Sequence, residues 1–206
     1  MLIGISLGPG DPGLLTFKAA AALKECTKVF VPGEMASDLA VPYCQPEILN
    51  FPMIGDEAKL EESWSRNANI VAGFASQMRT GFGCMGDVNT FSTFTHLKRV
   101  IARDYPVVEV ETIPGVSIVS ALASCFGIGL ERSFQVTDGS SLESVIRMKA
   151  NRPRIMAREL EAQGFDWFIL GKRLCTPEES IIQSDLAEDL PDDSDYFSVL
   201  YARRKR

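Results

Sequence analysis

The sequence predicts an α/β protein, and two patterns support this prediction. In the first half, short apolar stretches alternate with segments whose apolar residues recur at helical spacing, an order typical of a parallel sheet with crossover helices. Three of the apolar stretches end in glycine-containing loops, at 8–13, 86–87 and 113–117. In the second half, strand-like segments dominate, and we expect a second α/β layer that is partly antiparallel.

The first residues predict a strand, a helix and a second strand. Residues 2–7 form an apolar run that leads into the Gly-Pro-rich turn at 8–13. Apolar residues then recur at helical spacing over 14–26, and the apolar stretch 28–31 stops at Pro32. A strand–helix–strand unit of this length implies that the two strands are parallel.

The middle of the chain continues the alternation. Residues 47–51 are a weak candidate for a strand, and 56–79 predicts one long helix or two short ones because apolar residues are spaced along a polar segment. We expect a strand at 81–85. The apolar stripe over 94–101 then predicts a helix, and 107–110 predicts the next strand.

The Pro-Gly turn within 113–117 is the expected domain boundary. It divides the chain into an N-terminal α/β domain at 1–112 and a C-terminal α/β domain at 113–206. An Ala-containing helix is expected at 116–126. The remaining elements expected in the second domain are a helix at 152–163 and strands at 134–137, 144–148, 166–170 and 196–201.

Composition limits the classes of function. The chain has 206 residues, 46% of them hydrophobic and 23% charged, and a net charge of −6. A nucleic-acid-binding protein usually has a basic excess, so we expect no nucleic-acid partner. No apolar run approaches the roughly 18 residues that cross a bilayer, so no membrane segment is expected. The first residues form a strand rather than a signal peptide, so we expect a cytoplasmic protein.

Cysteine and histidine usage argues against several kinds of site. The five cysteines have no C-x-x-C spacing, so we expect no disulfide framework and no metal site, and we expect most of the thiols to be buried. His96 is the only histidine. A single histidine on an expected helix is more typical of a structural role, and it makes triad hydrolysis and multi-histidine metal chemistry poor candidates.

The first glycine loop has the form G-x-G-x-x-G between a strand and a helix, as in dinucleotide-binding proteins. Two features argue against a phosphate ligand. Pro9 and Pro12 remove amide donors from the loop, and Asp11 would place a negative charge beside the phosphate. The loop therefore suits close backbone approach, with a purely structural turn as the alternative.

The other two loops also follow expected strands. Asp87 comes directly after Gly86 at a strand end, where α/β sheets bind ligands, and its carboxylate suits a hydroxyl, an amine or a cation. Alternatively, Asp87 caps the following helix. Ser117 has the same two interpretations, as a helix cap or a ligand contact. Two acidic loops together favour a ligand that carries positive charge and hydroxyl groups.

The three loops together resemble the signatures of the tetrapyrrole methylases, the S-adenosylmethionine-dependent enzymes of corrin and sirohaem synthesis. The opening signature stands as Leu-Gly-Pro-Gly-Asp-Pro-Gly-Leu-Leu-Thr at 7–16. The second stands as Met-Gly-Asp-Val-Asn-Thr-Phe at 85–91, and the third as Pro-Gly-Val-Ser-Ile at 114–118. Their order and spacing fit the family almost from end to end.

Within this family, the sequence most resembles the branch that methylates C-20 of precorrin-2 or cobalt-factor II. The resemblance lies in Val88, where the family usually has proline, in the Thr-Phe-Ser-Thr-Phe run at 90–94, and in the segments 148–151 and 176–179. The alternatives keep the fold and cofactor but change the acceptor to another corrin position, a sirohaem precursor or the diphthamide precursor. A non-catalytic nucleotide-binding α/β protein is a further alternative.

The resemblance also implies an architecture and a site. It implies two αβα domains with a cofactor cleft between them, usually in a homodimer, and a tetrapyrrole substrate. The implied contacts to S-adenosylmethionine, and to its product S-adenosylhomocysteine, are Pro9, Met85, Gly86, Asp87, Thr90, Ser117, Ile118 and Met148. Cys175 stands where the family has a glycine that contacts the cofactor, so that contact requires the backbone alone.

The implied substrate carries many carboxylates, so a chain of net charge −6 needs a local basic patch. The substrate-binding candidates are Asp11, Lys18 and Lys149, and the wider basic candidates are Arg132, Arg152 and Arg158. The implied reaction is displacement at a sulfonium methyl, which needs alignment more than acid or base catalysis. Asp87 is the one candidate for removing the proton from the methylated carbon.

Overall fold

The structure is a computed structural model that describes residues 1–52 and 57–205. Contacts divide the chain into two compact units, Met1–Phe134 and Gln135–Arg206. The predicted boundary between 112 and 113 falls earlier in the chain, so helix α5 (Ile118–Phe126) is grouped with the first unit by contacts. The domain limits of 1–112 and 113–206 stay a prediction.

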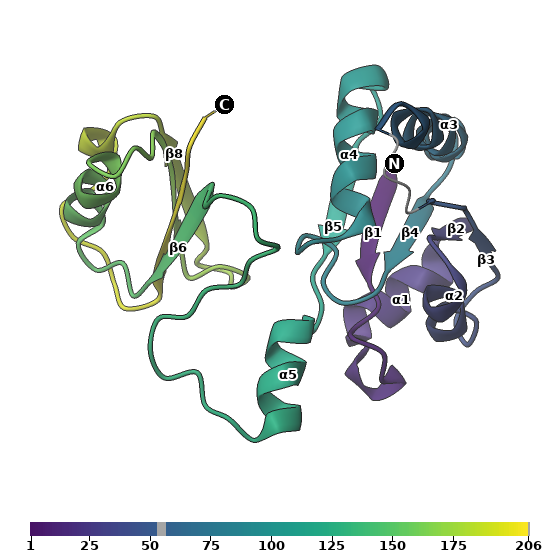
Figure 1. Ribbon diagram of the computed structural model, residues 1–206, viewed down its shortest axis with the longest axis horizontal. Helices are drawn as coiled ribbons and strands as arrows, with labels where there is room; N and C mark the ends of the chain where they lie inside the picture. The colour runs from purple at the N-terminus through teal and green to yellow at the C-terminus, as the bar shows by residue number, and fades with distance from the viewer. Residues whose placement is uncertain (53–56, 206) are drawn as a thin grey trace. The chain divides into compact units, whose positions relative to one another are not determined.

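The first unit contains a five-stranded sheet with the order β3-β2-β4-β1-β5, in which every described pair is parallel (Figure 1). Its strands are β1 (Leu2–Ser6), β2 (Lys28–Val31), β3 (Pro46–Ile48), β4 (Thr80–Cys84) and β5 (Val110–Ile113). Because all strands run the same way, their carboxyl ends and the loops that follow lie along one edge of the sheet.

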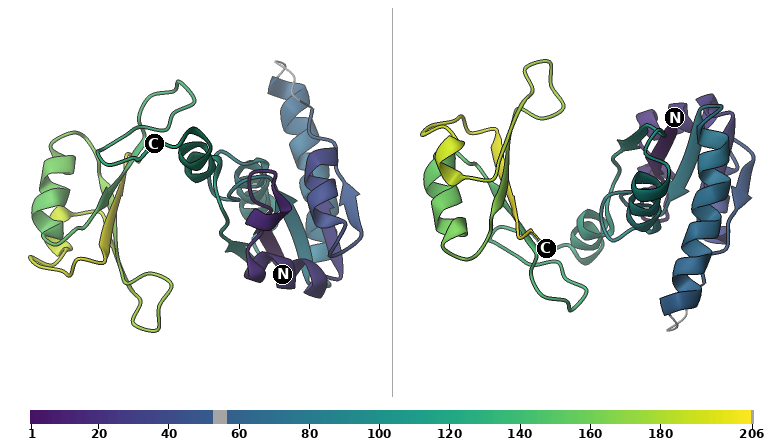
Figure 2. Two further views of the ribbon diagram at one scale, coloured as in Figure 1. Left: turned by 90° about the horizontal axis from the view of Figure 1, so that it is seen from below. Right: turned by 90° about the horizontal axis from the view of Figure 1, so that it is seen from above.

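Helices cover both faces of this sheet (Figures 1 and 2). The helical elements are η1 (Pro12–Leu14), α1 (Phe17–Glu25), α2 (Glu34–Ala40), α3 (Glu57–Ala75), α4 (Thr93–Asp104) and α5 (Ile118–Phe126). One apolar core joins α1 and α2 to Ile3 and Ile5, and the other joins α3 and α4 to Leu2 and Phe82. Alternate residues of β1 thus enter opposite cores, as the period of a strand requires.

Most expected elements of the first unit are present. The strands at 2–7, 28–31 and 81–85 are confirmed, and 57–75 forms one long helix, whereas residue 56 lies outside the described residues. The strand expected at 107–110 is wrong, because Val107 lies in a turn with 87% of its surface exposed and β5 begins at Val110. Helix α2 was not predicted.

The second unit is a four-stranded sheet of order β6-β9-β7-β8 with α6 packed on one face (Figure 2). Its elements are β6 (Ser144–Met148), α6 (Pro153–Glu161), β7 (Trp167–Lys172), β8 (Ser180–Ser184), η2 (Ala187–Asp189) and β9 (Ser198–Arg203). Leu160 of α6 packs with Phe168, Leu170 and Leu200 of the sheet.

Three expectations for this part of the chain are corrected. All described strand pairs of this sheet are antiparallel, not only some of them. Residues 134–137 form no strand, since this segment is exposed and pairs with no neighbour that could satisfy its backbone. The last strand is β9 at 198–203 rather than 196–201, and strand β8, which has alternating but mostly exposed residues, was not predicted.

Candidate functional site

The three loops predicted from the sequence lie side by side at the carboxyl edge of the parallel sheet. They follow β1, β4 and β5, and β1 lies between the other two strands. The carboxyl edge of an open parallel sheet is the usual place for a ligand, because loops from neighbouring strands converge there. The strand order therefore brings 8–13, 85–90 and 113–117 into one site.

Backbone hydrogen bonds join the first loop to the second. The amide of Gly86 donates to the carbonyl oxygen of Gly8 at 2.7 Å, and the amide of Gly8 donates back to the carbonyl oxygen of Gly86 at 3.2 Å. Both residues have positive φ angles, +75° for Gly8 and +69° for Gly86. Glycine adopts this left-handed conformation at little cost, so it is the residue that permits this short bridge.

Asp87 joins the second loop to the third. Its Oδ2 accepts a hydrogen bond from the amide of Gly115 at 2.9 Å. Its Oδ1 accepts one from the amide of Asn89 at 2.9 Å and one from the hydroxyl of Thr90 at 3.2 Å. Helix α4 begins after Ser92, so the alternative that Asp87 caps this helix is wrong.

Gly115 approaches β1 more closely than any other residue type allows. An ideal Cβ at Gly115 would lie 2.4 Å from the Cβ of Ser6, closer than carbon atoms come without displacement. Ser6 is fully buried, and its hydroxyl contacts the loops after β4 and β5. Neither residue was predicted from the sequence to have a role of this kind. The small residue types at two strand ends were the available signal for this close approach.

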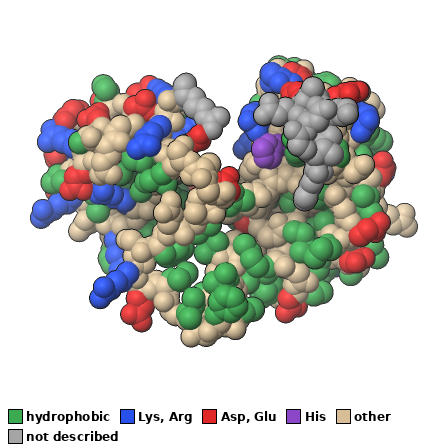
Figure 3. Space-filling model, in the orientation of Figure 1, with side chains coloured by type: hydrophobic (Ala, Val, Ile, Leu, Met, Phe, Trp, Pro, Cys, Tyr) green, Lys and Arg blue, Asp and Glu red, His purple; other side chains and the backbone are tan. Residues whose placement is uncertain are grey.

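Ser117 acts as a helix cap. Its hydroxyl accepts a hydrogen bond from the amide of Ser120 at 3.5 Å, and the next residue, Ile118, begins α5 with 62% of its surface exposed. The cap interpretation of Ser117 is therefore supported, while its ligand contact and that of Ile118 stay predictions. Helix α5 has no buried residue, and Figure 3 shows hydrophobic side chains gathered over it.

The other predicted residues of the first unit lie in or beside the first loop. Pro9 is half-buried beside Gly8. Asp11 is exposed and accepts a hydrogen bond from the amide of Gly13 at 2.8 Å, which caps η1. Lys18 is exposed in the first turn of α1. Asp11 thus stabilises the turn, and its role toward a ligand stays a prediction.

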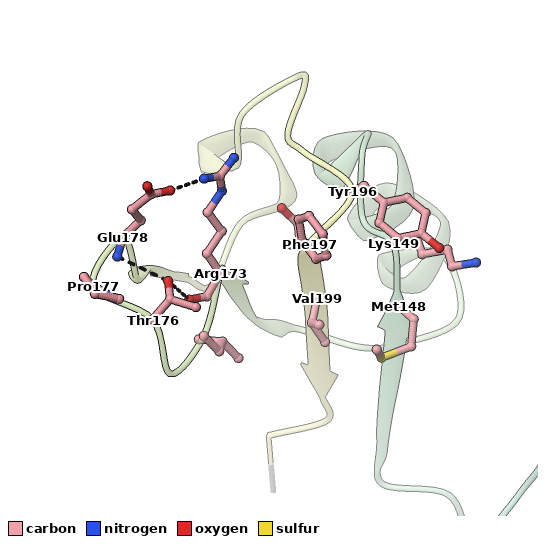
Figure 4. Close-up of a pocket in the computed structure, with 11 residues that line it drawn as sticks. Met148, Lys149, Arg173, Thr176, Pro177, Glu178, Tyr196, Phe197 and Val199 are labelled. Carbon is pink, nitrogen blue, oxygen red and sulfur yellow. Dashed lines mark hydrogen bonds and ion pairs between the residues drawn. The ribbon is translucent and has the colours of Figure 1, made fainter.

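Met148 and Lys149 belong to the second unit, where they line a pocket of about 740 Å³ (Figure 4). Aromatic and aliphatic side chains, among them Tyr196, Phe197 and Val199, form much of its wall. The ammonium group of Lys149 lies 5.0 Å from the ring centre of Tyr196, and the hydrogen bond and charge interaction with Tyr196 raise the pKa of this lysine. A pocket of this size, with apolar walls and a few charged groups, suits a small organic ligand.

The loops around this pocket hold non-glycine residues in the left-handed conformation. The φ angles are 56° at Lys149, 46° at Arg173 and 66° at Cys175. Arg173 bonds to Glu178 and to Asp195, which ties two loops of the wall together (Figure 4 shows the pair with Glu178). Cys175 takes the backbone conformation typical of glycine, so a contact made through the backbone alone remains compatible with the cysteine.

The basic candidates differ in their surroundings. Arg158 forms two hydrogen bonds with the carboxylate of Glu188, at 2.5 Å and 2.7 Å, so its charge is already matched within the protein. Arg132 and Arg152 are exposed. The structure therefore leaves Lys18, Lys149, Arg132 and Arg152 as the better candidates for an anionic ligand.

His96 lies on α4, and the five cysteines differ in burial. The ring of His96 packs 5.2 Å from that of Trp64, and burial together with Arg99 lowers its pKa. All five cysteines are free, but only Cys26 and Cys84 are buried, so the expectation that most are buried is wrong. Burial raises the pKa of Cys84 to about 12, which keeps this thiol protonated.

Metal-binding clusters and membrane-spanning helices are absent from the described residues. Among them, no group of three or more His, Cys, Asp or Glu side chains is placed to hold a metal ion. Over the same part of the chain, every helix is too short or too polar to span a membrane.

Comparisons with known proteins match this chain to one protein family and to its relatives. The sequence model of the family described as Tetrapyrrole (Corrin/Porphyrin) Methylases matches residues 1–188. The chain is 27% identical over 224 residues to the probable cobalt-precorrin-2 C(20)-methyltransferase of Methanocaldococcus jannaschii, covering 98% of this chain and 95% of the relative. It is 25% identical over 234 residues to the precorrin-2 C(20)-methyltransferase of Sinorhizobium sp, covering 97% and 93%.

A solved structure supports the fold. The crystal structure of the methyltransferase CobJ aligns with a TM-score of 0.52 and 17% sequence identity, covering 100% of this chain and 95% of that protein. At this identity the likeness concerns the fold alone, and it agrees with the α/β class predicted from the sequence.

Proposed function

The chain belongs to the tetrapyrrole (corrin/porphyrin) methylase family, and from this premise we propose that it transfers a methyl group from S-adenosylmethionine to C-20 of precorrin-2 or cobalt-factor II. The observation that carries the choice of acceptor is the similarity, over nearly the whole length of both chains, to proteins named as C(20)-methyltransferases of cobalt-precorrin-2 and precorrin-2. Corrin synthesis is the pathway in which such a reaction belongs.

The geometry of the three loops supports the proposed cofactor. An ideal Cβ at Gly86 would meet no atom within 4 Å, so the backbone there borders open space that a ligand can enter. Gly10, with a φ of +138°, is exposed in the neighbouring loop. The proposed cofactor contacts are Pro9, Met85, Gly86, Asp87, Thr90, Ser117, Ile118 and Met148.

The charge of Asp87 suits this cofactor. When bound, S-adenosylmethionine supplies a methyl group on a positively charged sulfonium. The carboxylate of Asp87 stabilises positive charge nearby and fixes the loops that hold the ligand. Both of its oxygens already accept hydrogen bonds from the protein, so we assign Asp87 to binding rather than to proton removal.

The chain supplies alignment rather than a strong base. The described residues of the three loops include no histidine, and the thiol of Cys84 at the end of β4 is buried and protonated. Holding the acceptor carbon and the methyl group in line contributes several kcal/mol or more, on the order of 7–11 in favourable cases. We assign this positioning to the loops of the first unit, with Asp11, Lys18 and Lys149 proposed to contact the substrate.

The acceptor assay tests the proposal most directly. The protein is incubated with S-adenosylmethionine labelled in its methyl group, in parallel with precorrin-2 and with cobalt-factor II, and the labelled product is mapped by NMR. We expect the label at C-20, and the comparison of rates shows which of the two acceptors is used. Label at another ring position, or label only when a sirohaem or diphthamide precursor is supplied, would overturn the proposed acceptor.

Calorimetry tests the cofactor separately. We expect S-adenosylhomocysteine to bind and NAD not to bind, because Pro9 and Pro12 remove amides that a dinucleotide phosphate would need. Binding of NAD without binding of S-adenosylhomocysteine would favour the alternative of a non-catalytic nucleotide-binding protein.

Two further properties complete the proposal. The family resemblance supports a homodimer, and light scattering coupled to size-exclusion chromatography measures the mass in solution. A mass near the 22.6 kDa of one chain would contradict the dimer. We propose a cytoplasmic location, which cell fractionation with an antibody to the protein tests.

A further inference from the structure

Ser6, the last residue of β1, contacts two loops with one hydroxyl group. Its Oγ donates a hydrogen bond to the carbonyl oxygen of Ile113 at 2.7 Å and accepts one from the amide of Val88 at 2.8 Å. The side chain is 0% exposed. One buried hydroxyl therefore joins the end of β1 to the end of β5 and to the loop after β4, with both its donor and an acceptor position in use.

We propose that Ser6 is a positioning residue of the cofactor site, which sets the spacing between the 85–90 loop and the 113–117 loop. This inference rests on the proposed function, since the spacing of these loops matters for activity only if they hold the cofactor. Ser6 itself lies beneath the loops and acts on the ligand through them.

Burial makes the two hydrogen bonds of Ser6 consequential. Val88 is 0% exposed and Ile113 is 6% exposed, so solvent has little access to the groups that the hydroxyl satisfies. Without it, a buried amide and a buried carbonyl oxygen lose a hydrogen-bond partner, a change that costs more than the bonds themselves contribute. The loops then regain partners by moving, which alters the spacing between them.

The neighbouring contacts indicate that the spacing is tightly fixed. An ideal Cβ at Gly115 would lie 3.3 Å from the Oγ of Ser6, so the third loop lies directly against the serine. The hydrogen bond from the amide of Gly115 to Asp87 joins the third loop to the second, and the bridge between Gly8 and Gly86 joins the first loop to the second. The second loop is thus connected to both the first and the third, and Ser6 adds buried hydrogen bonds from β1 to the second loop and to the start of the third.

Thr80 provides a matched comparison. It is also 0% exposed and lies in the same sheet, at the opposite end of β4. Its hydroxyl donates to the carbonyl oxygen of Met78 at 3.3 Å, two residues away in the chain, whereas the partners of Ser6 are 107 and 82 residues away. Loss of the Thr80 hydroxyl therefore removes a partly buried, local hydrogen bond without disconnecting two loops.

The test compares Ser6→Ala with Thr80→Val in the full chain. Urea unfolding measures stability, calorimetry measures the affinity for S-adenosylhomocysteine, and amide hydrogen exchange without ligand measures loop order. We expect both variants to lose stability, but only Ser6→Ala to weaken S-adenosylhomocysteine binding, by about tenfold. Only Ser6→Ala is expected to speed exchange in the 85–90 and 113–117 segments, with exchange in β2 unchanged.

The measurements distinguish a failure of this inference from a failure of the proposed function. If the wild-type protein does not bind S-adenosylhomocysteine, the proposed function fails, while the exchange measurement still decides whether Ser6 holds the loops. Equal exchange in the two loops of Ser6→Ala and Thr80→Val would overturn the inference, as would unchanged affinity in Ser6→Ala with loosened loops. If Ser6→Ala does not fold, Ser6→Cys keeps a weak donor at the same Cβ, and we expect an intermediate loss of affinity and intermediate exchange.

Discussion

The carboxylate of Asp87 accepts a hydrogen bond from the backbone amide of Gly115 at 2.9 Å, across two loops that are far apart in the sequence. This contact gives one residue two properties, a negative charge at the proposed cofactor site and a structural connection between its walls. The two properties respond differently to substitution, which makes them separable.

Asp87→Asn and Asp87→Ala separate charge from connection. The asparagine substitution removes the negative charge but keeps one of the two accepting oxygens, which can still accept the hydrogen bond from Gly115, whereas the alanine substitution removes the charge and both acceptors. We expect Asp87→Asn to weaken binding of the positively charged S-adenosylmethionine more than binding of the neutral S-adenosylhomocysteine. Asp87→Ala is expected to weaken both and to lower the free energy of unfolding by about 1–3 kcal/mol. Calorimetry and urea unfolding measure these quantities.

The opposite result for Asp87→Asn is also informative. Equal losses of affinity for the charged and the neutral ligand would show that the carboxylate acts through loop geometry alone. A large loss of stability in Asp87→Ala with unchanged affinity for both ligands would remove Asp87 from the cofactor site.

Gly115→Ala tests the close approach of the third loop to β1. The added Cβ would lie 2.4 Å from the Cβ of Ser6, so the loop must move, and we expect unfolding to become easier by about 1–3 kcal/mol. Gly73→Ala is the control, because an ideal Cβ at Gly73 meets no atom within 4 Å on the surface of α3 and alanine favours a helix. We expect this change to stabilise by about 0.5–1 kcal/mol. If Gly115→Ala and Gly73→Ala have similar effects on thermal unfolding, the close contact between Gly115 and Ser6 is contradicted.

The lowered pKa of His96 predicts a pH dependence of stability. Burial is the main cause and Arg99 the second, so the folded protein binds the proton less tightly than the unfolded chain, whose histidine has a pKa near 6.5. Between the two pKa values the unfolded state therefore holds more protons, and stability falls as the pH is lowered through 6.5 toward the folded pKa. Above this range the histidine is neutral in both states and contributes no slope.

Paired unfolding curves measure the contribution of His96. The wild type and His96→Phe, which keeps a ring against Trp64, are unfolded in urea at several pH values between 8 and 5. Glu61 and Arg103 line the same pocket and are left in place by this substitution. We expect the wild type to lose more stability than the variant over this range. If the free energies of unfolding of the two proteins change equally with pH, the titration of His96 contributes nothing to stability.

Cys175→Gly tests the left-handed turn beside the pocket of the second unit. Relief of the steric cost at a φ of 66° exceeds the extra flexibility that glycine gives the unfolded chain, so we expect a gain of about 0.5 kcal/mol. Cys125→Gly, inside helix α5, is the control and is expected to lose about 0.3 kcal/mol. Thermal unfolding distinguishes the two. A marked loss in Cys175→Gly would show that the thiol makes a contact of its own.

The sequence predicted the first unit better than the second. Strands β1, β2 and β4 are apolar runs that end in glycine or proline, and this signal is local. Strand β8 was missed because most of its residues are exposed, which leaves no apolar run to detect. Strand β5 was misplaced because Val107 is β-branched and apolar yet lies in an exposed turn.

For the candidate site too, the sequence predicted some features and not others. Gly8, Gly86 and Asp87 were found because small and acidic residues at strand ends are visible in the sequence. The connections between them were not, because Ser6 resembles any other residue of a buried strand. Its importance comes from partners that the fold brings together.

The sequence by itself determined the α/β class, the family resemblance and the three loops, because periodicity, glycine and proline act over a few residues. The tertiary structure decided which loops meet. The strand order β3-β2-β4-β1-β5 places β1 between β4 and β5, so Ser6 reaches residues 82 and 107 positions away. Hydrogen bonds over such separations depend on how the strands assemble, and only the folded chain fixes that.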